Sequence, residues 1–272
     1  MHTAINGAKF AIIDVETTGL DPMIDRIVEI ACVVNQDGQR LETFTSLVNP
    51  RRQIPSTASA VHHITDRDVC GAPTIGELEP ILKQLTAGAV VVAHNASFDL
   101  GFLPFLASRP SLCTMRLAMR VILDAPNYKN QVLRYHLGID DLPADVTAHR
   151  ALGDIEVTSR ILEMCLTRYL QAGGVDDVAE LLSYMKTPHR LMALPFGKHR
   201  GVDITHVPTD YLRWLARAGQ RNRDRRSPHG NRGTGPSATF VIIRVSSPVP
   251  LPRFSSGPKT LCHTSDVLFA LN

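Results

Sequence analysis

The chain has 272 residues, of which 44% are hydrophobic and 20% are charged. This length predicts one domain of about 170 to 200 residues with an appendage, rather than two equal domains. No run of about 18 apolar residues is present, which excludes a membrane span. Residues 1–9 lack the basic and apolar regions of a secretory signal, so we expect a cytoplasmic protein.

The net charge of +3 is unevenly distributed, because residues 220–272 carry seven Arg, one Lys and two Asp and so contribute +6. Residues 1–219 are therefore mildly acidic, at −3. The global charge is no argument that the folded part binds a polyanion, and bound cations would have to reverse its local sign. The five scattered cysteines favour neither a disulfide framework nor a zinc site.

Three strands are predicted in the first fifty residues, over residues 9–15, 26–34 and 41–48, with a turn at 35–38. Strands joined by such short turns form an antiparallel meander. Residues 89–93 are wholly apolar and β-branched in the middle, which predicts a central strand covered on both faces.

Helices are predicted between and after these strands. Thr74 and Glu77 have the spacing of a capping box, which opens an amphipathic helix with Ile81, Leu82 and Leu85 on its core side. Further helices are predicted over residues 96–106, from about residue 114, over 151–169 and over 176–185. A meander followed by alternating strands and helices indicates an α/β protein, with a mixed sheet and helices on its faces.

Three regions are predicted along the chain. Residues 8–172 form the main domain, which ends where Gly173 and Gly174 stop the longest helix. Residues 173–219 form a small separate module. In residues 220–272, Arg, Ser, Pro and Gly occupy 24 of 53 positions, which predicts a disordered basic tail.

Asp14 and Glu16 directly follow the apolar run Phe10–Ile13. On a strand, residues two apart share a face, so both carboxylates point the same way while Val15 packs on the other face. Two carboxylates on a rigid strand suit a hard divalent cation. Two such cations about 4 Å apart can stabilise both the attacking and the leaving oxygen of a phosphodiester.

Two more carboxylates are placed to complete such a site. Asp99 follows the strand predicted over 89–93, at the end where α/β sheets bind ligands, and Asp154 lies in the first turn of the longest helix. His149 is predicted to lie in a turn before that helix, because in a continuous helix it would be about 140° away from Asp154. A histidine there can act as the general base for an attacking water.

Each of these motifs also has a purely structural interpretation. An Asp-x-Glu after a strand is usually turn chemistry or solvated charge, and His94-Asn95 before a helix serves equally well as a cap. A single histidine is more often a surface residue than a base. The combination of four carboxylates and a histidine, in this order and at these element ends, is what indicates a metal-dependent nuclease.

Residues 14–19, 94–99 and 149–154 resemble the three exonuclease motifs of the DnaQ-like superfamily, in its DEDDh branch, where the last His and Asp are also five residues apart. The resemblance covers about residues 8–170. It implies a ribonuclease H-like fold and hydrolytic 3′→5′ removal of nucleotides with two Mg²⁺ or Mn²⁺ ions.

The same resemblance implies roles for individual residues. The implied metal ligands are Asp14, Glu16, Asp99 and Asp154, with Asp14 shared by both ions, and the implied general base is His149. The implied substrate-binding residues are Val15, Thr17, Gly19, Leu20, His62, Asn95 and Phe98. Leu20 is the implied wedge against the terminal base, and relatives often have Gly where this chain has His63.

Residues 196–201 and 210–215 look like the small C-terminal module of exonuclease X-like proteins. The expected phosphate contacts are Lys198, His199 and Arg200, and the expected core residues are Tyr211 and Trp214. An ordinary turn followed by an amphipathic helix is the alternative interpretation.

The sequence therefore predicts a metal-dependent 3′→5′ exodeoxyribonuclease of exonuclease X type, which acts on single-stranded or frayed DNA 3′ ends. The alternatives are an epsilon-type proofreading subunit of DNA polymerase III, a 3′ exoribonuclease, or an inactive nucleic-acid-binding docking module. The intact set of five motif residues argues against the inactive module. DNA and RNA stay open as substrates, because the 2′-OH is read by pocket shape, which motifs do not show.

Overall fold

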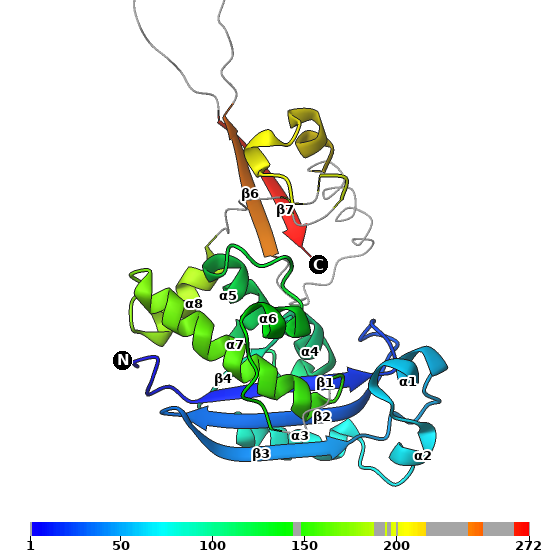
Figure 1. The fold of residues 1–272 in the computed structure, drawn as a ribbon. Coiled ribbons are helices and arrows are strands. Elements are labelled where there is room, and N and C mark those ends of the chain that lie inside the picture. Colours follow the sequence, from blue (N-terminus) through cyan, green and yellow to red (C-terminus); the bar gives the residue numbers. More distant parts are fainter. Residues whose placement is uncertain are drawn as a thin grey trace, which may run out of the picture. The chain divides into compact units, whose positions relative to one another are not determined.

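The structure is a computed structural model that describes residues 2–143, 148–187, 194, 197–199, 201–215, 239–246 and 264–271. The chain divides into two compact units, Met1–Lys186 and Thr187–Asn272. The first unit contains a five-stranded sheet with helices on its faces, as predicted (Figure 1).

The sheet is mixed, with the strand order β3-β2-β1-β4-β5. Its strands are β1 (Phe10–Thr17), β2 (Ile27–Gln36), β3 (Gln39–Leu47), β4 (Val90–Ala93) and β5 (Ser111–Cys113). The predicted meander is confirmed, since β2 pairs antiparallel with both β1 and β3. The other half is parallel, with β4 between β1 and β5.

The helices predicted for the first unit begin close to their expected positions, whereas those over 56–62, 66–69 and 130–136 were not predicted. In chain order the helices are α1 (Ser56–His62), α2 (Asp66–Val69), α3 (Ile75–Leu85), α4 (Ala96–Phe102), the 3₁₀ turn η1 (Pro104–Leu106), α5 (Thr114–Val121), α6 (Asn130–His136), α7 (Ala151–Gln171) and α8 (Val178–Lys186). The predicted capping box is present at the start of α3, where Thr74 and Glu77 exchange hydrogen bonds.

Two helix predictions need correction. The helix predicted over 96–106 is divided, because Pro104 has no N–H to donate to the preceding turn, and α4 ends at Phe102. Ile81 was expected on the core side of α3, but its side chain is exposed whereas Leu82 is buried. Consecutive helical residues point about 100° apart, so these two side chains cannot both face the core centre.

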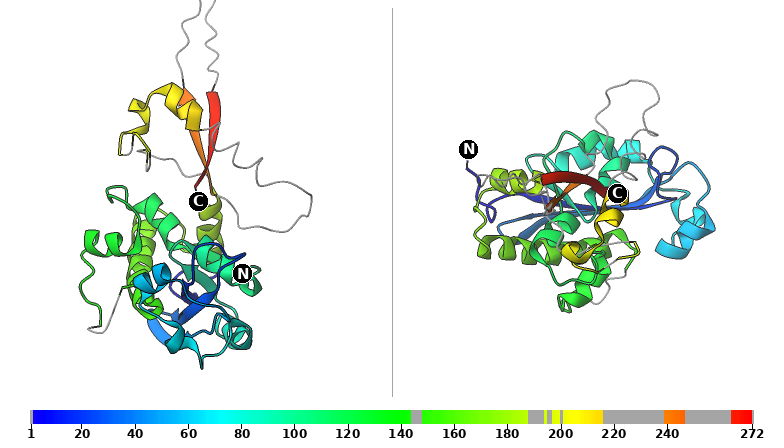
Figure 2. Two further views of the ribbon diagram at one scale, coloured as in Figure 1. Left: turned by 90° about the vertical axis from the view of Figure 1, so that its right-hand side faces the viewer. Right: turned by 90° about the horizontal axis from the view of Figure 1, so that it is seen from above.

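Alternate residues of β1 pack on opposite faces of the sheet. Ile13 belongs to the apolar cluster that includes residues of α3, α4 and η1, and Ile12 belongs to the cluster that includes residues of α5, α6, α7 and α8. Asp14 and Glu16 continue the alternation of Ile12 and so face α7. The views in Figure 2 show helices on both sides of the strands.

The first unit extends past the predicted boundary at residue 172. Leu181 and Met185 of α8 are buried in the same apolar cluster as the main helices, which ties α8 to this unit. Among the described helices, none is long and apolar enough to cross a membrane.

The second unit contains a small apolar cluster and a pair of strands. The cluster is built from Leu194, Val207, Leu212 and Leu215, around the 3₁₀ turn η2 (Ile204–His206) and the helical residues 209–215. The strands β6 (Thr239–Ser246) and β7 (Thr264–Leu271) pair antiparallel.

Within residues 220–272, which were predicted to be a disordered tail apart from some periodicity around Phe240–Val245, the structure describes the strand pair β6 and β7. The run Phe240–Val245 is apolar and β-branched, a composition that favours a paired strand. The pairing covers the full length of β6 and β7. The remaining residues of 220–272 lie outside the described part of the chain, and the prediction of disorder for them stays a prediction.

Candidate active site

Strand β1 extends beyond its parallel neighbour. Its pairing with β4 covers only Phe10, Ala11 and Ile12, whereas its pairing with β2 continues to Thr17. The last residues of β1 are therefore held from one side only. They lie at the carboxyl end of the parallel strands, where α/β sheets leave space for ligands.

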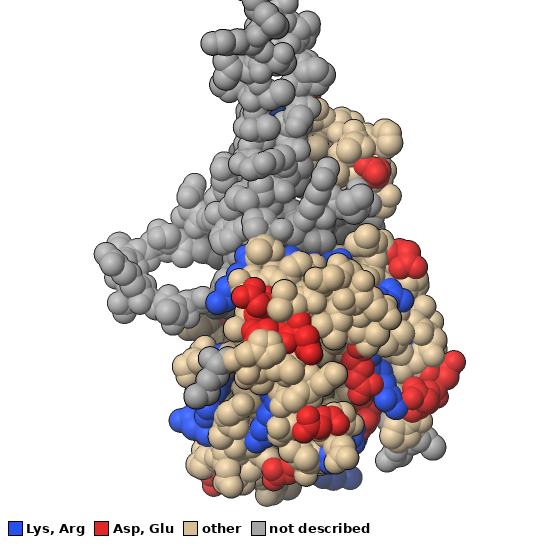
Figure 3. Space-filling model, turned by 90° about the vertical axis from the view of Figure 1, so that its left-hand side faces the viewer, with Lys and Arg blue, Asp and Glu red and all other residues tan. Residues whose placement is uncertain are grey.

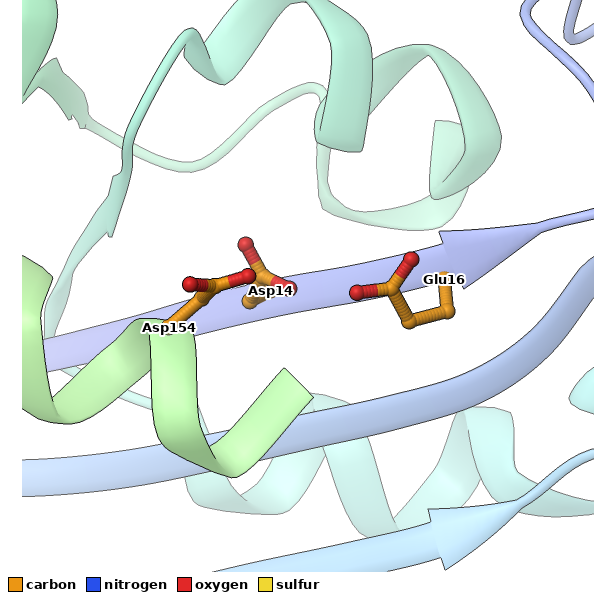
Figure 4. Close-up of side chains that lie close together, drawn as sticks. All are labelled: Asp14, Glu16 and Asp154. Atoms are coloured by element: carbon orange, nitrogen blue, oxygen red, sulfur yellow. The ribbon is translucent and has the colours of Figure 1, made fainter. Parts of the chain in front are cut away.

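Three of the predicted carboxylates come together at this edge. One oxygen each from Asp14 and Glu16 of β1 and from Asp154 of α7 lie within 4.8 Å of one another. Figure 4 shows the three side chains gathered in the space between the strand and the helix. Hard oxygen donors at this spacing are what Mg²⁺ or Mn²⁺ prefers in proteins.

Asp99, the fourth predicted carboxylate, lies near this group but is not part of it. It occupies the first turn of α4 and is 2% exposed. Its Oδ2 has no hydrogen-bond partner among the described residues. A buried carboxylate oxygen is costly unless a donor or a cation neutralises it. Asp99 is therefore suited to a second cation beside the group of three.

Burial and neighbouring acidic groups raise the pKa of the four carboxylates. Burial, followed by the charge of Asp99, raises the pKa of Asp14 well above its usual range. Burial and the nearby acidic groups raise the pKa of Glu16 to about 8, and burial raises the pKa of Asp99 to about 7. Buried like charges at short range favour the protonated forms. Divalent cations would reverse this balance, so the chemistry of the donor set fits a metal site.

Asp154 is held in position by two hydrogen bonds. Its Oδ1 accepts from Nε2 of Gln131 at 2.8 Å, and its Oδ2 accepts from the backbone N–H of His149 at 3.1 Å. Asn130, next to Gln131 on α6, donates to Oγ1 of Thr158 at 2.8 Å and so ties α6 to α7. The sequence analysis missed Gln131, because α6 lies in no motif and its neighbour in the fold is far along the chain.

His149 lies in a turn directly before α7, as predicted. Its backbone has a φ of 61°, and its side chain is exposed. The hydrogen bond from its N–H to Asp154 fixes this turn against the group of three carboxylates. The ring therefore starts from a constrained backbone next to the site and is accessible to water.

The turn that carries His149 is also anchored to the sheet by Glu29. Nη2 of Arg150 donates to Oε1 of Glu29 at 2.6 Å, and its Nε lies 3.1 Å from both carboxylate oxygens. The backbone N–H of Ala151, the first residue of α7, donates to Oε2 of Glu29 at 2.9 Å. Glu29 is 4% exposed and lies opposite Glu16 in the β1–β2 register. In the sequence, the only sign of this role is that Glu29 is a single acidic residue inside an apolar stretch that is predicted to be a strand.

The loop after β1 is rigid and ends in an exposed leucine. Oγ1 of Thr17 donates to the carbonyl of Gly19 at 2.6 Å. A Cβ at Gly19 would lie 2.4 Å from Oδ2 of Asp25, so a larger residue there would have to displace the Asp25 side chain. Leu20 is 84% exposed, which leaves it free to contact a ligand. Two exposed apolar residues that the sequence analysis missed follow it: Met23 and Ile24.

Three predicted substrate-binding side chains are buried, and one of them is Thr17, which is 8% exposed. Val15 is 5% exposed and packs on the α3 side of the sheet, so only its backbone faces the site. His62 is 1% exposed, and its Nδ1 accepts a hydrogen bond from the N–H of Ile64 at 3.0 Å. A contact from His62 to substrate would require its ring to become accessible.

Asn95 and Phe98 lie where β4 leads into α4. Asn95 precedes the helix with a φ of 68°, and Phe98 is partly buried with its ring centroid 5.1 Å from that of Phe102. The neighbouring His94 is structural, because its ring nitrogens lie 2.9 Å from Oγ1 of Thr114 and 2.8 Å from the carbonyl of Tyr128. Burial lowers the pKa of His94 to about 4.

Comparison with known proteins places this geometry in a family. The family described as Exonuclease matches residues 11–162, and a second, described as Putative quorum-sensing-regulated virulence factor, matches residues 188–223. Exodeoxyribonuclease 10 of Escherichia coli (strain K12) is 35% identical over 209 residues, which are 75% of this chain and 89% of that protein. The chain belongs to the DnaQ-like exonuclease family.

Solved structures agree with this assignment. "Exonuclease X in complex with 5' overhanging duplex DNA" is 33% identical, with a TM-score of 0.53 over 65% of this chain and 99% of that chain. Exonuclease I of E. coli, solved with a dT13 oligonucleotide, has a TM-score of 0.53 at 15% identity and covers 65% of this chain and 46% of that chain, a likeness of fold alone. The ribonuclease H-like fold predicted from the sequence is thereby confirmed.

Other relatives are longer proteins. The DNA polymerase III subunit epsilon-like protein of Rhodobacter capsulatus is 38% identical over 201 residues, which are 70% of this chain and 28% of that protein. This chain therefore spans about a quarter of that relative's length.

Proposed function

We propose that the protein is a metal-dependent 3′→5′ exodeoxyribonuclease of exonuclease X type, which removes nucleotides from single-stranded or frayed DNA 3′ ends. The observation that carries the proposal is the group Asp14, Glu16 and Asp154 within 4.8 Å, beside the buried Asp99. DNA as the substrate is supported by the name of the E. coli relative and by the DNA in the Exonuclease X complex.

Four side chains would hold the metal ions. We assign Asp14, Glu16 and Asp154 to one Mg²⁺ or Mn²⁺ ion, and Asp14 with Asp99 to a second. Bound ions supply positive charge that stabilises the phosphodiester oxygens as the bond breaks. The protein's part is to keep these carboxylates in place before substrate arrives, which Gln131 does for Asp154.

His149 is assigned the proton transfer. The attacking water loses a proton to the imidazole as its oxygen bonds to the terminal phosphorus. The 3′-oxygen of the preceding nucleotide leaves, and a nucleoside 5′-monophosphate is released. Such general-base catalysis typically contributes about 10² to 10⁴ in rate. The exposed ring, on a turn hydrogen-bonded to Asp154, supports this role.

The terminal nucleotide is assigned to the loop after β1 and to the start of α4. Leu20 is exposed and suited to wedge against the last base, while Thr17 and Gly19 present backbone groups in a fixed conformation. Asn95 and Phe98 would border the same nucleotide from α4. The backbone of Val15 and the ring of His62 are the remaining assigned contacts.

Digestion of 5′-labelled oligonucleotides tests the proposal. With Mg²⁺, single-stranded DNA should shorten stepwise from its 3′ end, and a matched RNA strand should be digested more slowly. Asp14→Asn in the same preparation should leave both strands intact. Faster digestion of RNA would favour the exoribonuclease alternative, and unchanged activity in Asp14→Asn would show that the site lies elsewhere.

A proofreading subunit is the second candidate, favoured by the 38% identity to the epsilon-like protein of R. capsulatus. The exonuclease X assignment accounts for more of both proteins, because that match covers 75% of this chain and 89% of the E. coli relative, against 70% and 28% for the epsilon-like protein. Stable association with a polymerase α subunit on a sizing column would favour proofreading. Full activity without any partner favours the exonuclease X assignment.

A further inference from the structure

The two units carry opposite net charge. Residues 1–186 contain 16 Lys and Arg against 22 Asp and Glu, a net charge of −6, whereas residues 187–272 contain 13 against 4, a net charge of +9. On the face of the first unit shown in Figure 3, acidic and basic side chains are interspersed. The first unit therefore has little general attraction for a polyanion, while the second unit attracts one strongly.

Among the described residues of the second unit, one aromatic side chain, Trp214, is exposed, while Tyr211 is partly buried against the apolar cluster. Trp214 was expected in the core of the module, but it is 53% exposed, because the core consists of the aliphatic residues Leu194, Val207, Leu212 and Leu215. Its ring centroid lies 5.5 Å from that of Tyr211, which lies 4.6 Å from that of His199. These three rings form a continuous row, and the end of the row at Trp214 is accessible.

The loop that carries Lys198 is held against this row of rings. The backbone N–H of Lys198 donates to Oη of Tyr211 at 3.1 Å, and Gly197 has a φ of 76°. A Cβ at Gly197 would lie 2.4 Å from the same Oη, so glycine is needed for this approach. The side chain of Lys198 is exposed and forms no ion pair with the described carboxylates. A free ammonium thus lies on the loop that contacts the central ring.

We propose that His199, Tyr211, Trp214 and Lys198, here named the aromatic surface, bind the single-stranded DNA that leads to the 3′ end. A base would stack on Trp214 while Lys198 contacts a neighbouring phosphate. Accessible aromatic rings combined with basic side chains are the usual means of holding single strands without sequence preference. The +9 charge of the unit fits a polyanion rather than a basic or neutral partner. The choice of DNA rests on the proposed function.

This assignment gives the aromatic surface a definite kinetic effect. Contacts that are equally strong in the ground and transition states lower KM without raising kcat. The aromatic surface carries none of the carboxylates that the hydrolysis requires. Its loss should therefore raise KM on DNA and leave kcat almost unchanged.

The chain offers a direct probe, because Trp214 is its only tryptophan. Full-length Asp14→Asn protein, which is not expected to digest DNA, is titrated with a 24-nucleotide oligo(dT) while tryptophan fluorescence is recorded. Stacking predicts saturable quenching that weakens as salt is added. No change in fluorescence at DNA concentrations that saturate binding, measured by anisotropy of a labelled oligonucleotide, would overturn the proposal.

Matched variants give a second test in the active full-length protein. Trp214→Ala should raise KM for the oligonucleotide about tenfold with kcat unchanged, since one stacked base is worth about 1 to 3 kcal/mol. Trp214→Phe, which keeps a ring, should restore most of the affinity. Tyr135→Ala removes a ring that is 73% exposed on the first unit and should have no effect. Equal KM values for Trp214→Ala and wild type would contradict the proposal.

The outcomes of these experiments also distinguish a failure of the aromatic surface from a failure of the proposed exonuclease function. Fluorescence quenching by a protein that digests neither DNA nor RNA would support the aromatic surface and contradict the nuclease assignment. If the protein digests DNA, but its fluorescence is not quenched and Trp214→Ala leaves KM unchanged, the nuclease assignment is supported and the aromatic surface is contradicted.

Discussion

The two units differ in how they use their side chains. Residues 1–186 bury apolar side chains on both faces of a five-stranded sheet, whereas the described part of the second unit has one cluster with four buried residues. The first unit holds one buried and three half-buried carboxylates close together against their mutual repulsion. The described part of the second unit exposes the ring of Trp214 and basic groups such as Lys198, which need no such support. The positioning of the carboxylates is thus assigned to the first unit, and the attraction of nucleic acid is assigned to the second.

The largest effect is expected from Asp14→Asn, which removes the ligand assigned to both ions. Hydrolysis of 5′-labelled DNA with Mg²⁺ should fall to near background. Trp214→Ala, its counterpart in the second unit, should keep the wild-type kcat. A folded Asp14→Asn protein that retains a tenth of the wild-type rate would break the proposed division between the units.

Asp14→Asn should increase the stability of the metal-free protein, although it abolishes hydrolysis. Burial and the nearby carboxylates raise the pKa of Asp14 above its ordinary 3.8. The stabilisation from the protonated group is therefore complete at low pH and is lost as the pH rises through the folded-state pKa. In EDTA at pH 8, Asn should raise the melting temperature. Adding Mg²⁺ should stabilise the wild type more than the variant.

His149→Ala should lower kcat by about 10² or more, because the water would lack its proton acceptor. The stabilisation that Mg²⁺ confers on the protein should be retained, since His149 is assigned no metal. Thermal shifts with and without Mg²⁺, beside single-turnover rates, measure both quantities. Loss of the Mg²⁺ effect would show that His149 is a ligand.

A pH dependence of stability is expected from His94, which is buried between Thr114 and the carbonyl of Tyr128. Burial lowers its pKa from 6.5 to about 4, so the unfolded chain binds its proton first as the pH falls. Its contribution is complete above the unfolded pKa and is lost between pH 6.5 and 4, by up to about 3 kcal/mol. Urea unfolding at several pH values should show that His94→Gln loses less stability at acid pH than the wild type does. Identical pH slopes would contradict this account.

Glu29→Ala should destabilise the protein by about 1 to 3 kcal/mol, because the N–H of Ala151 loses its buried acceptor. It should also lower kcat more than it raises KM, since the turn with His149 loses its anchor. Glu29→Gln keeps an acceptor and should recover most of the stability. If Glu29→Gln also recovers kcat, the ion pair with Arg150 is unnecessary for positioning.

The smallest effect is expected at His63, the C-cap of α1, whose φ is 58°. Glycine adopts this conformation without strain, so His63→Gly should stabilise the protein by up to about 1 kcal/mol. His136→Gly, at the last residue of α6, removes a side chain from helical backbone and should destabilise the protein by up to a similar amount. Denaturant midpoints compare the two, and a loss of stability in His63→Gly would mean that its side chain makes a needed contact.

Several features followed from local rules alone. The period-2 alternation after Ile12 was enough to place Asp14 and Glu16 on one face, and the resulting geometry is confirmed by the group of three carboxylates. The capping box at Thr74 and the turn at His149 were also predictable, because each depends on residues within five positions of it.

The amino-acid sequence by itself determined the mixed sheet, the carboxylate-bearing strand and the family to which the chain belongs. Only the tertiary structure decided that Asp99 lies beside the group of three rather than within it, and that Gln131 and Glu29 hold the start of α7. It also decided that Trp214 is exposed, because the aliphatic residues fill the small core first. These outcomes depend on contacts between segments far apart in the chain, whose geometry no local pattern specifies.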